Sequence, residues 1–134
     1  MAPVLKVEAI PTVKATKGAT ATVVLKAALP AGYHANTNKP TEAYLIPLTL
    51  KWTSGPLEAE LVEYPKGGME KYSFSDKPLS VVTGPFSITT RFKVPASAQN
   101  GPAAQNGTLR YQACDNKACY PPKNVPVSFT VSID

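Results

Sequence analysis

The chain has 134 residues, of which 43% are hydrophobic and 17% charged, and this length and composition predict a single globular domain over residues 1–134. Its net charge of +5 comes from basic residues scattered along the sequence, without the basic and aromatic clusters of a nucleic-acid-binding surface. No apolar run approaches the roughly 18 residues that a transmembrane helix needs, so neither nucleic-acid binding nor a membrane span is expected.

Short segments rich in valine, threonine and aromatic residues recur along the chain, and each predicts a β-strand. In chain order they cover residues 5–10, 20–29, 33–36, 45–52, 57–64, 79–82, 86–94, 107–114 and 125–133. Proline and glycine separate them, and 14 prolines leave little room for helices. Several short strands at regular spacing predict an all-β sandwich, with a mobile loop at 96–105.

The pattern typical of antibody domains, two distant cysteines with a tryptophan between them, is missing from this predicted sandwich. Only four residues separate Cys114 from Cys119, the only two cysteines of the chain. Trp52 is therefore expected to be a core residue, in preference to a platform for a ligand.

Side chains along a β-strand alternate between its two faces, and this alternation predicts the face on which each cysteine lies. Within 109–114 the side chains alternate, with Leu109, Tyr111 and Ala113 on one face and Arg110, Gln112 and Cys114 on the other. Cys114 is thus expected on the polar face. If 115–118 form a four-residue hairpin loop, Cys119 lies opposite Cys114 on that face, at a separation that a disulfide can span.

Such a disulfide has two interpretations. Closing a loop of about six residues stabilises a fold by only about 2 kcal/mol, and strained or exposed disulfides are the more easily reduced ones. The pair can therefore be a redox centre that is repeatedly made and broken. It can equally be a small, inert clip on a hairpin.

No other catalytic chemistry is visible in the sequence. His34 is the single histidine, and with two cysteines it falls short of the four ligands of a structural zinc site. No carboxylate pair, nucleophile elbow or phosphate-binding glycine loop is present. We therefore expect neither a metal nor another cofactor, and the cysteine pair is the only candidate for chemistry.

The sequence around the cysteines, YQAC at 111–114 and CYPP at 119–122, resembles the redox motif of a known family. Segments 30–36, 39–47 and 124–129 add to the likeness, which runs over most of the chain. The family is the N-terminal periplasmic domain of the thiol:disulfide interchange protein DsbD, also called disulfide bond corrector.

The resemblance implies an immunoglobulin-like sandwich that acts as a monomeric protein-disulfide reductase. In the family this domain takes electrons from the thioredoxin-like C-terminal domain of the same protein. It passes them to periplasmic acceptors, such as disulfide isomerases and the thioredoxin-like proteins of cytochrome c maturation. Each step is thiol–disulfide exchange through a mixed disulfide. By analogy Cys119 forms the mixed disulfide and Cys114 resolves it.

The resemblance also implies a short cap loop whose aromatic side chain covers the disulfide until a partner displaces it. The candidate segment is 67–76, with Phe74 as the first choice for the cap and Tyr72 as the second. Alternatively, Phe74 begins a strand and packs in the core.

Further residues are expected around the disulfide. Where better-known members of the family carry tyrosines, this chain has His34 and Asn36. A histidine beside a thiol can lower the thiol's pKa or relay its proton, although a lone strand histidine can equally be a surface residue. Asp115 is expected to raise the pKa of a neighbouring thiol by like-charge repulsion.

The residues that flank the cysteines complete the expected site. Tyr111 precedes them in the motif, and Tyr120 and Pro121 follow them. Tyr120 and the Pro121–Pro122 pair are expected either to form part of a docking rim or to make a rigid exit into the last strand.

Two functions remain open from the sequence. One is a periplasmic redox carrier that relays electrons between thioredoxin-fold partners. The other is a non-catalytic extracytoplasmic sandwich that binds a ligand or spaces domains and carries a structural hairpin disulfide. Residues 1–3 suggest an initiator methionine placed before a mature, exported domain without its leader or any membrane domain.

Overall fold

The computed structural model describes residues 5–42, 44–72, 74–75 and 77–134, and within these ranges the chain forms β-strands and no helix. Accordingly, no helix long and apolar enough to span a membrane occurs in this described part of the chain. The predicted all-β architecture is confirmed.

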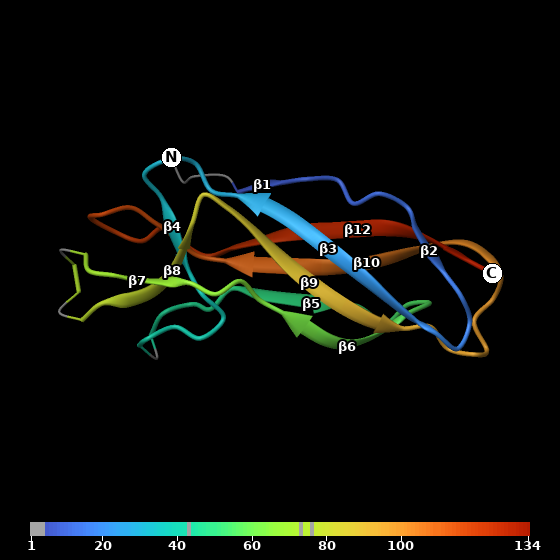
Figure 1. Ribbon diagram of the computed structural model, residues 1–134. Coiled ribbons are helices and arrows are strands. Elements are labelled where there is room, and N and C mark those ends of the chain that lie inside the picture. Colours follow the sequence, from blue (N-terminus) through green and yellow to red (C-terminus); the bar gives the residue numbers. More distant parts are fainter. Residues whose placement is uncertain (1–4, 43, 73, 76) are drawn as a thin grey trace.

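Two four-stranded sheets face each other along the length of the molecule (Figure 1). The first has the order β1 (Lys6–Val7), β3 (Thr20–Ala28), β9 (Pro85–Lys93) and β6 (Glu58–Glu63). The second has the order β2 (Val13–Ala15), β12 (Lys123–Ile133), β10 (Gly101–Tyr111) and β5 (Thr49–Trp52). Neighbouring strands are antiparallel except β2 and β12, which are parallel.

A third sheet lies at one end of this sandwich, with the order β11 (Ala113–Cys114), β4 (His34–Asn36), β8 (Leu79–Thr83) and β7 (Gly68–Glu70). In Figure 1, β4, β7 and β8 lie at the left, opposite to the C-terminus. Gly84 alone separates β8 from β9, and its φ of 59° lets the chain turn sharply from the end sheet into the first sheet.

The core lies between the two long sheets, because burial alternates along β3, β9, β10 and β12 and turns one face of each strand inwards. Trp52 packs against both hydrophobic clusters of this core. Its ring meets Phe92 and Phe129 edge-on, and its Nε1 donates a hydrogen bond to Thr90 Oγ1 over 2.9 Å. The structure therefore confirms Trp52 as a core residue.

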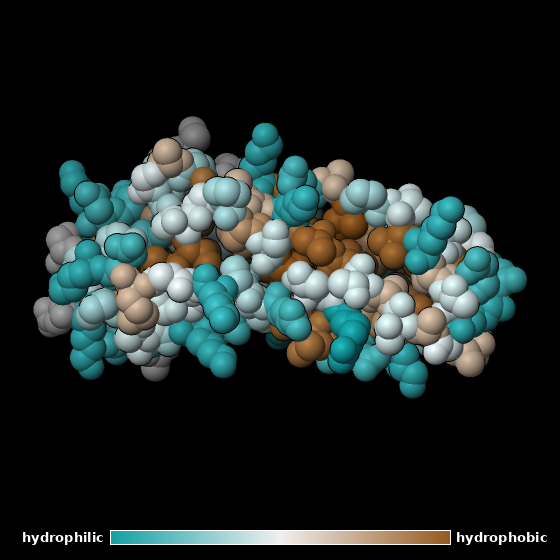
Figure 2. Space-filling view, in the orientation of Figure 1, coloured by the Kyte–Doolittle hydropathy of each residue, from teal (hydrophilic) through white to brown (hydrophobic). Residues whose placement is uncertain are grey.

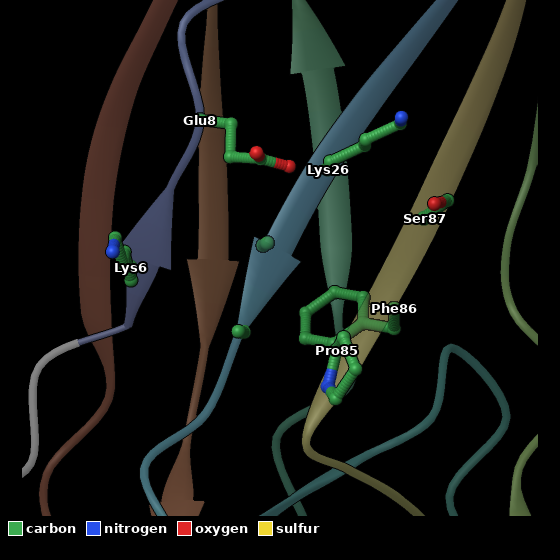
Figure 3. Close-up of a pocket in the computed structure, with 8 residues that line it drawn as sticks. Lys6, Glu8, Lys26, Pro85, Phe86 and Ser87 are labelled. Atoms are coloured by element: carbon green, nitrogen blue, oxygen red, sulfur yellow. The ribbon is translucent and has the colours of Figure 1, made fainter.

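Hydrophilic side chains dominate the surface in Figure 2, and hydrophobic ones show through in separate groups. Val24, Leu61 and Met69 are large exposed hydrophobic residues on three different strands. A depression on the first sheet is lined by Lys6, Glu8, Lys26 and the rings of Pro85 and Phe86, among others (Figure 3). Scattered apolar groups of this kind are ordinary for a protein surface.

Several predicted boundaries were wrong. Residues 101–105, expected in a loop, form the start of β10 because they pair in register with the end of β12. β2 and β7 were missed because each has three residues, too few to show a period. The predicted strands 5–10 and 45–52 shorten to Lys6–Val7 and Thr49–Trp52, the residues that pair in register with β3 and β10.

The most consequential correction concerns 107–114, which was predicted to be one strand. The chain leaves the second sheet after Tyr111 and enters the end sheet at Ala113, with Gln112 between the two strands. The alternation of buried and exposed side chains along β10 does not continue into β11, where Ala113 and Cys114 are both buried. The expectation that Cys114 lies on a polar face is therefore wrong.

Candidate active site

The predicted disulfide between Cys114 and Cys119 is present, with Cα atoms 3.9 Å apart. The two cysteines face each other in an isolated antiparallel bridge, and the predicted four-residue loop connects them. Asp115 N donates to Ala118 O and Tyr120 N donates to Ala113 O, each over 2.9 Å. These bonds make the cysteine segment a small hairpin on the edge of the end sheet.

The side chain of Asp115 holds this loop in shape. Its Oδ1 accepts hydrogen bonds from the backbone N–H groups of Lys117 and Ala118, both at 2.8 Å, as aspartate commonly does in tight turns. The hydroxyl of Tyr120 donates to Asp115 Oδ2 over 3.2 Å. The backbone hydrogen bonds are the main reason why the pKa of Asp115 is lowered, and the bond to Asp115 raises the pKa of Tyr120.

The two sulfur-bearing residues differ in exposure. Cys114 is 0% exposed, whereas Cys119 is half-buried. Cys114 belongs to β11, which β4 covers on one side and the Cys119 bridge on the other. Cys119 is therefore the more exposed cysteine of the pair.

His34 is the direct cross-strand neighbour of Cys114 in the pairing of β4 with β11. It is buried, and its Nε2 has no hydrogen-bond partner among the residues that the structure describes. Burial lowers the pKa of His34, and the charge of Asp115 partly opposes this effect. The alternative that His34 is a surface residue is therefore wrong.

Three aromatic rings stack beside the disulfide hairpin. The ring centroids of His34 and Tyr72 are 4.0 Å apart with planes inclined by 10°, and those of Tyr72 and Phe74 are 5.6 Å apart. Tyr72 and Phe74 lie in the loop between β7 and β8, so Phe74 does not begin a strand. Phe74 does pack against a small hydrophobic cluster that includes Leu79.

The expected cap segment thus lies next to the cysteines, although Ser73 and Asp76 fall outside the described residues. Tyr72, the second choice for the cap, is the ring that meets His34 most closely, and the centroid of Phe74 lies farther from His34, at 6.3 Å. The loop of 71–78 is therefore linked to Cys114 through His34, the neighbour of Cys114 in the sheet.

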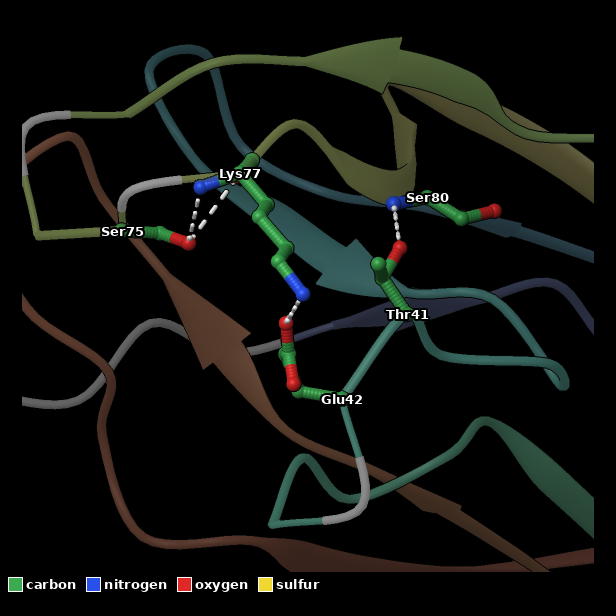
Figure 4. Close-up of polar contacts among 5 residues, drawn as sticks. All are labelled: Thr41, Glu42, Ser75, Lys77 and Ser80. Carbon is green, nitrogen blue, oxygen red and sulfur yellow. Dashed lines mark hydrogen bonds and ion pairs between the residues drawn. The ribbon is translucent and has the colours of Figure 1, made fainter.

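Polar contacts hold this loop against the segment that follows β4 (Figure 4). Ser75 Oγ donates to Lys77 O and accepts from Lys77 N. Lys77 forms an exposed ion pair with Glu42, and Thr41 Oγ1 accepts a hydrogen bond from Ser80 N over 3.1 Å. Ion pairs this exposed contribute little to stability, so the Lys77–Glu42 pair adds little to the anchoring of the loop.

Gln112 is a site residue that sequence reasoning missed. Its Nε2 donates to Tyr120 O over 3.2 Å, and its Oε1 accepts from Ile46 N over 3.4 Å. Asn36, which is buried, donates to Ile46 O over 3.0 Å and to Gln112 Oε1 over 3.5 Å. Gln112 therefore joins the segment after Cys119 to β4. Its place in the cysteine motif, just before Ala113, could have marked it as a site residue from the sequence.

The remaining predicted residues lie in different surroundings. Tyr111 is buried in the main core cluster, where its hydroxyl accepts a hydrogen bond from Leu5 N over 3.1 Å. Tyr120 is half-buried, and its ring lies 6.1 Å from that of Tyr33, another residue that sequence reasoning did not select. Pro121 is exposed.

A pocket opens beside the disulfide loop. Its lining includes His34 and Tyr72 together with Tyr33, Thr83 and Asn116. It therefore brings the aromatic stack, the end of β8 and the cysteine loop to one place on the surface.

An all-β sandwich with a short-range disulfide at one end, one cysteine more exposed than the other, has the arrangement of a thiol–disulfide exchange domain. The family model for the N-terminal region of the thiol:disulfide interchange protein DsbD matches residues 1–130, and the chain belongs to this family. The fold is accordingly immunoglobulin-like, as predicted.

Among solved structures, the N-terminal periplasmic domain of ScsB from Proteus mirabilis is similar to this chain, with a TM-score of 0.63 and 13% sequence identity. The match covers 87% of this chain and 42% of the ScsB chain, so this chain spans about two-fifths of that length. At this identity the likeness shows the fold.

A second solved structure is only weakly similar to this chain. AggA, the major subunit of aggregative adherence fimbriae type I from Escherichia coli, matches with a TM-score of 0.41 and 8% identity over 99% of this chain and 95% of its own. A search of the curated proteins finds no match to this chain.

Proposed function

We propose that this domain is a protein-disulfide reductase that relays electrons through Cys114 and Cys119. A thioredoxin-like donor reduces the disulfide, and the resulting dithiol reduces disulfides of acceptor proteins. The observation that carries this proposal is the unequal exposure of the pair, since Cys119 is half-buried and Cys114 is fully covered. In this proposal the partner attacks Cys119, and Cys114 is the sulfur that leaves and later re-forms the disulfide.

The proposed exchange is a sequence of two-electron steps. A donor thiolate attacks Cys119 Sγ, the Cys114–Cys119 bond breaks, and Cys114 leaves as a thiolate that takes up a proton. The second donor thiolate attacks the donor sulfur of the mixed disulfide and releases Cys119 as a thiolate, which also takes up a proton. The donor ends with a disulfide and this domain with two thiols. The reverse sequence passes both electrons to an acceptor.

Docking is proposed to involve the aromatic stack and the rim of the hairpin. Tyr72 and Phe74 belong to the loop that serves as the cap, with Tyr72 stacked on His34. Tyr120 and Pro121 follow Cys119 directly, and Pro121 is exposed. A partner that displaces the cap loop and contacts these residues would gain access to Cys119.

The setting that we propose is the periplasm or another extracytoplasmic compartment, where the domain works as a monomer. Its proposed donor is a thioredoxin-like domain of the same system. Its proposed acceptors are a disulfide isomerase or a thioredoxin-like protein of cytochrome c maturation. Membership of the family that matches residues 1–130 supports this setting, and so does the printed description of the ScsB domain as periplasmic.

The alternative is a non-catalytic sandwich with a structural hairpin clip, and the complete burial of Cys114 favours it. A redox titration distinguishes the two functions. The protein is equilibrated in graded glutathione or dithiothreitol buffers, thiols are trapped with a mass-tagging alkylating reagent, and the tags are counted.

For the relay, we expect a reversible two-electron transition above about −300 mV, the level below which structural disulfides usually lie. We also expect a thioredoxin-like protein to accelerate the exchange. A pair that stays oxidised far below that potential, or that ignores thioredoxin-like proteins, would support the structural clip.

A further inference from the structure

We propose that His34 is the proton acceptor for Cys114 when the dithiol closes to the disulfide. This inference rests on the proposed function, since it names a residue that serves the same cysteine pair. It concerns the resolving step, in which the Cys114 thiol must lose its proton before it can attack. His34 is the group that the sheet places next to that thiol.

The first support is the register of the end sheet. His34 and Cys114 are directly paired in the antiparallel ladder of β4 and β11. Directly opposed residues place their side chains on the same face, with Cβ atoms about 4.5–5.5 Å apart. The side chains of His34 and Cys114 therefore lie side by side on one face of the end sheet, and the imidazole is the titratable group that this register places nearest to the sulfur.

The second support is an unused ring nitrogen. His34 is 2% exposed, and its Nε2 lacks a hydrogen-bond partner within the described part of the chain. An unpaired polar atom at such a depth costs stability, so it calls for an explanation. A nitrogen kept free to receive a proton supplies one.

The third support is the charge around the ring. The disulfide loop contributes Asp115, whose carboxylate favours the protonated imidazole, whereas burial favours the neutral one. The cap loop contributes Tyr72, whose own pKa is raised, so that it stays uncharged near neutral pH. β8 contributes Thr83, which does not titrate, as the other cross-strand neighbour. The imidazole of His34 is thus neutral before it accepts the proton of Cys114, and the carboxylate of Asp115 stabilises the imidazolium that forms.

Cys114 needs such an acceptor because it is fully covered. Only the thiolate attacks a disulfide, and apolar burial raises the pKa of a thiol. At 0% exposure the Cys114 thiol has little access to bulk water or to buffer bases. A neighbouring neutral imidazole can take the proton without exposing the thiol.

The proposed step begins from a mixed disulfide between Cys119 and the partner. The proton of the Cys114 thiol moves to His34 Nε2, and the Cys114 thiolate attacks Cys119 Sγ. The Cys114–Cys119 bond forms, the bond between Cys119 and the partner breaks, and the partner sulfur leaves as a thiolate. The imidazolium then passes its proton to that thiolate or to water, so protons and electrons balance.

A chromogenic disulfide, dithionitrobenzoate, separates the two attacks without a protein partner. When the reduced protein is mixed with one equivalent of the reagent, attack by Cys119 releases one coloured thiolate and leaves a mixed disulfide. Attack by Cys114 on that mixed disulfide releases the second. The first phase therefore reports on Cys119, and the second phase reports on the step assigned to His34.

The variants are His34→Phe, which keeps a flat ring for Tyr72, and His34→Ala, which leaves a space. We expect the second phase of His34→Phe to be about 10²-fold slower near neutral pH, within the usual contribution of a positioned acid or base. Its rate should rise about tenfold per pH unit, because only thiolate attacks. The wild-type rate should change little between the pKa of His34 and that of the thiol.

Two further comparisons separate proton transfer from simple damage to the fold. Added imidazole should restore the second phase of His34→Ala, whose space it can enter, and should leave His34→Phe slow. Thr90→Val is the control for lost stability, because Thr90 is buried in β9 and bonds to Trp52 in the core of the sandwich. It should leave the pH profile of the second phase unchanged.

A second phase in His34→Phe with the wild-type rate and pH profile would overturn the inference, and so would a slowing that is equal at every pH. If His34→Ala does not fold, the pH profile of His34→Phe decides by itself. Failure of the relay would appear in the redox titration and in exchange with thioredoxin-like proteins. The two proposals therefore fail in different measurements.

Discussion

The ring of His34 stacks on that of Tyr72, and His34 is also the cross-strand partner of Cys114. One side chain therefore connects the loop between β7 and β8 to the disulfide. Any movement of this loop must break the stack, and any change at the disulfide occurs next to it. This relationship leads to predictions about access, pH and the order of attack.

Loss of the stack should make the disulfide easier to reduce. An aromatic pair contributes about 1 kcal/mol beyond its buried area, so Tyr72→Ala should raise the fraction of open loop about fivefold. The rate of reduction by dithiothreitol should rise by a similar factor. Tyr72→Phe keeps the ring and should react like the wild type.

Tyr44→Ala is the matched control for that experiment, because Tyr44 is 68% exposed and lies two residues after Glu42, which pairs with Lys77 of the loop. It should leave the reduction rate unchanged. Equal rates for Tyr72→Ala and the wild type would show that the stack does not limit access to the disulfide.

The stability of the oxidised domain should depend on pH through His34. The group titrates near 6.5 in an unfolded chain, and burial lowers its pKa in the folded state. As pH falls below 6.5, the unfolded state takes up a proton that the folded state does not, so the free energy of unfolding falls. The fall ends once the pH passes below the folded pKa.

Urea unfolding of the wild type and of His34→Phe across this pH range isolates that contribution, since the carboxylates titrate alike in both proteins. The difference in free energy of unfolding between the two should shift in favour of His34→Phe as the pH falls. A constant difference would contradict the lowered pKa of His34.

The exposure of the two sulfurs predicts which cysteine forms mixed disulfides. In reduced Cys114→Ser the remaining thiol of Cys119 is half-buried, whereas in reduced Cys119→Ser the remaining thiol of Cys114 is covered. We expect Cys114→Ser to form a mixed disulfide with a thioredoxin-like partner at least about tenfold faster, since reaction requires access. Mass spectrometry of trapped complexes measures this, and the reverse order would reassign the two roles.

Gln112 should couple stability to reactivity. Gln112→Ala removes the bonds to Tyr120 O and Ile46 N and should cost about 1–2 kcal/mol. It should also speed reduction of the disulfide, because the segment after Cys119 loses its link to β4. Urea unfolding and the dithiothreitol rate test both effects.

Gln105→Ala is the matched control. Gln105 also bonds to two backbone groups, Leu57 N and Thr53 O, but lies in the sandwich instead of the end sheet. It should lower stability and leave the reduction rate unchanged. Faster reduction in Gln105→Ala would mean that general loss of stability, and not Gln112 itself, controls access.

Asp115 should act on the loop mainly through its acceptor oxygen. Asp115→Ala removes the acceptor for Lys117 N and Ala118 N, whose amide hydrogen exchange should become severalfold faster. Asp115→Asn retains a side-chain oxygen and should protect both amides nearly as well. Equal exchange in all three proteins would show that the loop holds its shape without this side chain.

Local features were predictable where the cause was local. The hairpin of 115–118 follows from an aspartate that bonds to the backbone two and three residues later, and the sandwich strands follow from alternation in long segments such as β3. Trp52 was assigned correctly because a large apolar ring on a strand generally packs inwards. The family resemblance pointed to segment 67–76, whose Tyr72 stacks on His34; its role as a cap stays a prediction.

The all-β class, the pairing of Cys114 with Cys119 and the loop between them could be predicted from the sequence. The change of sheet at Gln112, the burial of Cys114 and the position of His34 opposite it became visible only in the folded molecule. The reason is that side-chain alternation and turn chemistry depend on neighbours along the chain. Which sheet a strand joins depends on pairing with residues far away in sequence, and for β11 that partner is β4, almost eighty residues earlier.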